Sequence, residues 1–151
     1  MARYVNPTMD TKFHIDFDWW QQQGLNLRVH LYDQLCSECR AKYVGSPPED
    51  IDWVSLDTGE VRRVDALWHV IRTHCSQQPE YLAESTPLTT AAFRIFLAND
   101  NMPLTPSGMH QFLRRKSPSL ILRTLGGHHT YMGIRPVALP VRRTAPRSGG
   151  G

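Results

Sequence analysis

Apolar and polar positions follow two different periods along the first part of the chain. Apolar residues first recur at every second position, which predicts a short strand over residues 13–17 with one buried face. From Asp18 they recur near multiples of 3.6 residues, which predicts one long helix over residues 19–43. The apolar positions of that helix are Trp20, Leu27, Leu31 and Leu35.

A turn signal divides the next apolar stretch. Residues 51–56 and 60–64 flank Asp57-Thr58-Gly59, and this pattern predicts a β-hairpin because glycine takes up the positive φ that such turns need. Asp65 is placed to cap a following helix that ends near Cys75. We therefore expect residues 1–80 to form one helix/hairpin module.

A hydroxyl residue followed by proline marks three helix starts in the second half. Thr86-Pro87, Thr105-Pro106 and Ser117-Pro118 each combine an N-cap residue with proline at the first helical position, where the amide has no helical partner in any case. The apolar stripe of the second of these helices is Met109, Phe112 and Leu113. Gly126-Gly127 ends the third helix, and residues 129–132 and 134–137 are then expected as two short extended pieces.

This order of elements resembles the winged helix-turn-helix family. The resemblance covers about residues 86–139 and rests on three short helices, the tight connection over residues 114–117 and a terminal β-ribbon. It implies that the helix over residues 117–125 lies in the DNA major groove and that the ribbon, called the wing, contacts the DNA backbone. The nucleic-acid-binding residues that it implies are Arg114, Arg115, Lys116, Ser119, Arg123, Thr124, His128, His129, Tyr131 and Arg135.

The distribution of charge changes abruptly at Asp100. The chain of 151 residues holds 17 Lys and Arg and 14 Asp and Glu, and all 14 acids lie within residues 1–100. The remaining residues carry 8 of the basic side chains and no acid, which is the pattern expected for DNA or another polyanion as partner. Three of these 8, Arg142, Arg143 and Arg147, belong to a predicted flexible basic tail over residues 140–151.

Cysteine and histidine residues form a spaced constellation in the acidic module. Cys36 and Cys39 are a C-x2-C pair, and His69, His74 and Cys75 follow 30–36 residues after it. Two pairs of N and S donors are typical of a structural tetrahedral Zn²⁺ site, with the three cysteines and either His74 or His69 as ligands. His69 and Cys75 would point about 240° apart on one helix, so sharing this site requires the helix to end before Cys75. Buried free thiols and a redox pair are the alternatives.

Several classes of protein do not fit this sequence. No apolar run approaches the roughly 20 residues of a membrane-spanning helix, and the first residues lack a secretory signal. We therefore expect a cytoplasmic protein with no membrane partner. Motifs typical of nucleotide-binding loops, zinc proteases, serine hydrolases and Rossmann domains are absent, so we expect no enzyme.

Together these patterns predict an α+β protein in two modules. An acidic module with a structural zinc ion (residues 1–80) packs with a basic winged helix-turn-helix-like module (residues 86–139). The first functional hypothesis is a DNA-binding regulatory or accessory protein, for instance in transcription regulation. The alternative is a non-catalytic protein–protein adaptor or a structural subunit of a larger complex. A protein partner or a homodimer is compatible with both.

Overall fold

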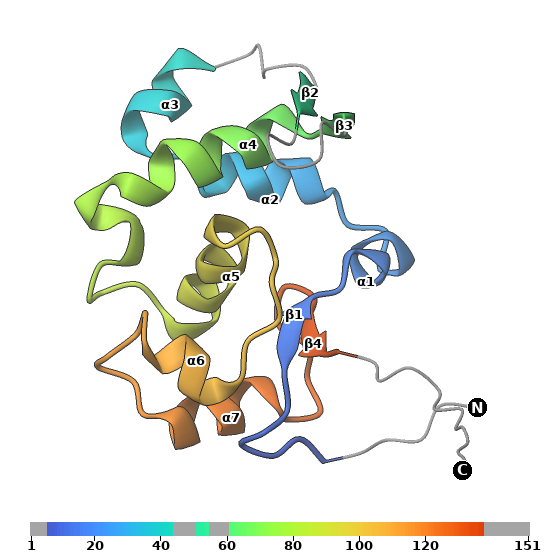
Figure 1. Cartoon of the computed structure of the whole chain (residues 1–151), viewed down its shortest axis with the longest axis vertical. Coiled ribbons are helices and arrows are strands. Elements are labelled where there is room, and N and C mark those ends of the chain that lie inside the picture. Colours follow the sequence, from blue (N-terminus) through green and yellow to red (C-terminus); the bar gives the residue numbers. More distant parts are fainter. Residues whose placement is uncertain (1–5, 44–50, 55–60, 138–151) are drawn as a thin grey trace.

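Figure 1 shows the computed structural model of the chain, which describes residues 6–43, 51–54 and 61–137. Helices dominate these ranges, and the strands form two small antiparallel sheets. The helices are α1 (Phe17–Gln22), α2 (Leu27–Asp33), α3 (Ser37–Lys42), α4 (Ala66–Thr73), α5 (Leu88–Ala98), α6 (Pro106–His110) and α7 (Pro118–Leu125). The strands are β1 (Phe13–Ile15), β2 (Ile51–Val54), β3 (Val61–Val64) and β4 (Ile134–Pro136), and the short 3-10 helices are η1 (Cys75–Gln77) and η2 (Pro79–Leu82).

Strand β1 is held on both edges by segments from the second half of the chain. On one edge it pairs antiparallel with β4, in a register that sets Ile15 opposite Ile134. On the other edge the amide and carbonyl of Phe13 bond those of Leu104, at N–O distances of 2.8 and 3.0 Å. The side chain of Asn101 continues this edge, because its Oδ1 accepts from the Ile15 amide at 2.8 Å and its Nδ2 donates to the Ile15 carbonyl at 3.0 Å.

The predicted long helix over residues 19–43 is wrong. Three short helices replace it, and the first break has a local cause. Gly24 takes a left-handed φ of +67°, and the Asn26 side chain then accepts from the Arg28 amide at 3.0 Å and starts α2. The second bend, between α2 and α3, buries Leu35 and Cys36 at 4% and 9% exposure. Apolar spacing alone carries no information on these local capping bonds.

The other predicted helices form, with small changes at their starts. Asp65 caps α4 by accepting from the Leu67 amide at 2.8 Å. Thr105 and Ser117 cap α6 and α7 as predicted, each accepting from the amide three residues further on. Helix α5 begins one residue later than predicted, because its N-cap is Pro87 and not Thr86.

The two predicted β-hairpins have different outcomes. Strands β2 and β3 pair antiparallel as predicted, whereas the Asp57-Thr58-Gly59 turn between them lies outside the described residues. The terminal ribbon is not formed between residues 129–132 and 134–137, because β4 pairs with β1 instead. The α+β class therefore stands, and the winged-helix arrangement stays a prediction. The predicted tail over residues 140–151 also lies outside the described residues.

One hydrophobic core serves both predicted modules. Helix α5 lies at its centre, with Phe93 and Phe96 fully buried, and in Figure 1 it stands between the α2–α4 layer and α6 with α7. The core cluster also holds Phe13 of β1 and Trp20 of α1. The Trp20 indole N–H donates to the carbonyl of Met132 at 3.1 Å, which fixes α1 to the segment before β4.

Candidate metal centre and predicted basic surface

The C-x2-C pair lies at the beginning of a helix. Cys36 is the N-cap residue of α3 and Cys39 lies in its first turn, three positions further on. Residues three apart on a helix lie on the same face, so both side chains point the same way. They are 9% and 6% exposed. The bend that ends α2 therefore creates half of the predicted site.

The other half lies where α4 ends. The helix stops at Thr73, and His74 leaves helical geometry with φ −123° and ψ −58° before Cys75 begins η1. The helix thus ends before Cys75, which was the condition for His69 and Cys75 to share a site. His69 stays on α4, outside the group of donors that gathers around Cys36. Of the two histidines considered as the fourth ligand, His74 is therefore the one that lies with the cysteines.

Four of the five predicted donors lie together. The sulfur atoms of Cys36 and Cys39 and a ring nitrogen of His74 are all within 4.8 Å of one another. The Cys75 sulfur is beside them, because it accepts from the Cys36 amide at 3.3 Å. Ligands bound at about 2.3 Å to one tetrahedral ion are roughly 3.8 Å apart, so a contraction of up to about 1 Å would seat an ion between the donors of Cys36, Cys39 and His74. None of the three cysteines forms a disulfide.

The electrostatics of the three thiols are unequal. Burial raises the pKa of Cys75 to about 12, and burial together with the neighbouring Cys36 raises the pKa of Cys39. Burial also acts on Cys36, but hydrogen bonds from the Cys39 amide and the Cys75 thiol outweigh it and lower the Cys36 pKa. Cys36 is therefore the thiol whose pKa the surroundings lower, while those of Cys39 and Cys75 are raised. A divalent metal ion would favour deprotonation of all three.

His74 is the outermost member of the cluster. Its side chain is 43% exposed, and its Nε2 lies 3.4 Å from the Glu38 carboxylate on α3. Carboxylates commonly orient the imidazoles of metal sites through such a contact. Three sulfur donors and one nitrogen donor allow a metal site in which the protein fills every position of a tetrahedron, as in structural and not catalytic centres.

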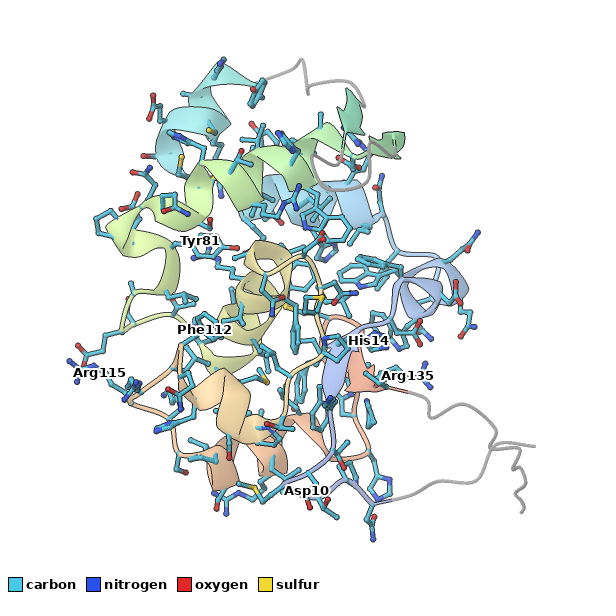
Figure 2. All side chains as sticks on the ribbon, in the orientation of Figure 1. Asp10, His14, Tyr81, Phe112, Arg115 and Arg135 are labelled. Atoms are coloured by element: carbon cyan, nitrogen blue, oxygen red, sulfur yellow. The ribbon has the colours of Figure 1, made fainter. Side chains whose placement is uncertain are left out.

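The predicted nucleic-acid-binding residues lie on several elements. Arg114, Arg115 and Lys116 form the turn between α6 and α7, while Arg135 is on β4. Figure 2 shows Arg115 and Arg135 on opposite sides of the view. Arg115 pairs with Glu84 at 3.2 Å, and Arg135 pairs with Asp16 at 3.4 Å. The structure thus does not bring all ten predicted residues onto one surface.

The turn between α6 and α7 holds the densest positive charge among the described residues. We call residues 111–116 the basic turn. Arg114 is exposed and donates to the Gln111 side chain and carbonyl, at 3.1 and 3.4 Å. Phe112 is 50% exposed because α6 ends at His110, before the predicted apolar stripe does. On α7, Ser119 and Arg123 are also exposed and Thr124 is partly buried.

The remaining predicted residues lie between α7 and β4. His128, His129 and Tyr131 are exposed, and the rings of His129 and Tyr131 contact each other at 4.5 Å between centroids. Together with Arg135 on β4, these three residues form a group of four that is separate from the basic turn, both in sequence and in the elements that carry it.

Comparison with known proteins gives no relative of this chain. A scan against protein-family models, a search of curated proteins and a search of solved structures found no match. Among the described residues, no helix is both long and apolar enough to cross a membrane.

Proposed function

We propose that this chain is a non-catalytic binding protein held together by a structural zinc ion on Cys36, Cys39, His74 and Cys75. The observation that carries the proposal is the convergence of N and S donors from two segments that are 35 residues apart. Zinc is the metal that this donor set favours, because thiolates select soft or borderline ions and an S₃N tetrahedron is a common structural zinc centre.

The zinc ion would act as a staple between α3 and the end of α4. Within α3, Cys39 is the only buried residue, so this six-residue helix has little hydrophobic contact with the core. Short isolated helices are unstable in water. Metal bonds to Cys36 and Cys39 would supply the attachment that apolar packing does not.

Zinc content and stability test this proposal. Purified protein is expected to contain about one equivalent of zinc by elemental analysis, and chelation is expected to lower its thermal midpoint. Cys39→Ser should remove the metal, whereas Ser37→Ala, an exposed neighbour in the same turn, should retain it. The proposal would be contradicted if zinc were added to the reduced, metal-free protein and its thermal midpoint did not change.

The second proposed function is nucleic-acid binding through the basic turn. Its support is the cluster of exposed Arg114 and Arg115 and partly buried Lys116 beside the half-exposed ring of Phe112. Cationic groups bind phosphates, and an exposed aromatic ring offers a surface on which a base stacks. The ion pair from Arg115 to Glu84 opposes this weakly, because both side chains are about 70% exposed and such pairs are worth roughly 0–1 kcal/mol.

Fluorescence anisotropy with labelled DNA tests this second function. Binding at low salt should weaken steeply as salt rises. The triple variant R114A/R115A/K116A should lose most of the affinity and reduce the salt slope, whereas Arg135→Ala on the other side of the molecule should change little. No binding at low salt to single-stranded or duplex DNA would overturn this function and leave the protein–protein adaptor as the alternative.

A further inference from the structure

Arg94 is a half-buried cation, and among the described residues no carboxylate pairs with it. It lies on α5, where its Nε donates to Gln34 Oε1 at 2.7 Å and its Nη1 donates to the Tyr81 carbonyl at 2.9 Å. Gln34 and Tyr81 are only 6% and 5% exposed. Within the described parts of the chain, every carboxylate lies beyond ion-pair distance of Arg94. Its two hydrogen-bond acceptors are both neutral.

A small, half-open pocket is shared by Arg94 and the candidate metal centre. It has a volume of about 140 Å³, and its lining includes Arg94, Cys36 and Cys75. Glu80 also lines it, but its side chain is exposed and forms no ion pair with the guanidinium. Cys36 and Cys75 are therefore the buried thiols that share this lining with Arg94.

The charge of a zinc–thiolate centre would complement this cation. One Zn²⁺ with three thiolates and a neutral imidazole has a net charge of about −1. A partly buried cation is less well solvated than one on the surface, and an anion close to it stabilises it with less screening than in bulk water. We propose that Arg94 is the counter-cation of the metal centre and strengthens its affinity for zinc. This inference rests on the proposed structural zinc.

The contacts around Arg94 hold it in this position. Gln34 presents its oxygen to Arg94 because its Nε2 donates to the His30 carbonyl at 3.2 Å. The Tyr81 hydroxyl donates to the Arg94 carbonyl at 2.7 Å, and its ring faces the guanidinium at 5.6 Å. Tyr81 is labelled in Figure 2, beside the segment that follows α4. Arg94 is thus a positioning residue that would act through charge and not through a bond to the metal.

Zinc affinity, measured by competition with a chromophoric chelator, tests the inference. Arg94→Met should weaken zinc binding by about 10–100-fold, the range seen when groups that support metal ligands are removed. Arg94→Lys, which keeps the charge, should restore most of that loss. The Co²⁺ spectrum of both variants should stay that of a tetrahedral thiolate site, because the four ligands are unchanged.

A second variant keeps the test decisive if Arg94→Met does not fold. Gln34→Glu keeps an oxygen acceptor for Arg94 and adds a competing carboxylate, so zinc affinity should fall about tenfold. The variant also loses the bond from Gln34 Nε2 to the His30 carbonyl, and urea denaturation of the metal-free protein measures that separate cost. Equal zinc affinity in wild type and Gln34→Glu, or equal losses in Arg94→Lys and Arg94→Met, would overturn the counter-cation role. Failure of wild type to bind zinc would instead overturn the proposed function itself.

Discussion

Gly133 lies where a side chain has no room. Its φ is +77°, in the left-handed region, and an added Cβ would be 2.5 Å from Nε1 of Trp20 and 3.2 Å from Cε3 of Trp19. The Trp20 indole cannot retreat freely, because it donates to Met132 and is 2% exposed. The glycine is therefore required both by backbone conformation and by the close approach of an aromatic ring.

The variant Gly133→Ala is expected to lose about 2–5 kcal/mol of unfolding free energy, from backbone strain and overpacking together. Gly24→Ala is its matched control, since Gly24 has a φ of +67° but nothing within 4 Å of an added Cβ. The control should lose only the backbone part, about 1–2 kcal/mol. Urea denaturation measures both; equal losses would show that the Trp20 contact carries no energetic weight.

Tyr81 predicts an alkaline loss of stability. Burial raises the pKa of its hydroxyl above the ordinary value near 10, with Cys75 adding to the rise and Arg94 opposing it. Because the folded pKa is the higher one, this stabilisation is complete below about pH 10 and is lost as pH rises further. Tyr81→Phe should be less stable than wild type at neutral pH by about 1 kcal/mol. The difference should shrink above about pH 10 in denaturation curves recorded across pH; a constant difference would contradict the assignment.

Single residues also show how far the sequence could predict the site. Cys36, Cys39, His74 and Cys75 could be found because donor type and spacing carry the signal. Arg94 could not, because a lone arginine in an apolar helix pattern gives no hint of which residues enclose it. The exposure of Phe112 could not be predicted either, because its spacing fits the apolar stripe of a helix and its exposure depends on α6 ending at His110.

At the scale of elements, predictability follows the range of the interactions. The starts of α6 and α7 were predictable because a hydroxyl cap and a proline act within one turn. The pairing of β1 with β4 was not, since it joins residues more than 100 positions apart and the local pattern favoured a ribbon within residues 129–137. The two hydrogen bonds from the Asn101 side chain to the backbone of Ile15, on the edge of β1, also have no sequence signature.

Asn101 tests the strength of that edge. Removing its amide in Asn101→Ala would leave the amide and carbonyl of Ile15 without partners, and the expected loss is about 2–5 kcal/mol of unfolding free energy. Asn101→Gly removes the same bonds but relieves the left-handed φ of 57°. Thermal or urea unfolding should place the glycine variant between alanine and wild type. A glycine variant as stable as wild type would show that the two side-chain bonds contribute nothing.

At the scale of the whole molecule, the two predicted modules depend on each other. The core cluster includes Phe13 and Trp20 from the first and Phe96 and Ile134 from the second. The basic residues of the second module also meet acids of the first, as in the pair of Arg135 with Asp16. The charge partition read from the sequence is therefore partly balanced in the folded chain.

Excision of the C-terminal segment tests this dependence. A fragment of residues 86–139 lacks β1, so β4 and Leu104 would lose their partner and Phe96 much of its cover. It is expected to be largely unfolded, with low helicity by circular dichroism and narrow amide dispersion by NMR, while the whole chain is folded. A fragment with dispersed signals and native helicity would instead establish an autonomous domain.

The position of β1 between two late partners also has a consequence for biosynthesis. The strand leaves the ribosome early, but Asn101, Leu104 and β4 are made about 90 to 120 residues later. Synthesis proceeds at roughly 5–20 residues per second, so the apolar side chains of Phe13 and Ile15 stay without their native partners for several seconds. Nascent copies should therefore be clients of chaperones, and slow translation should lower the yield of native protein.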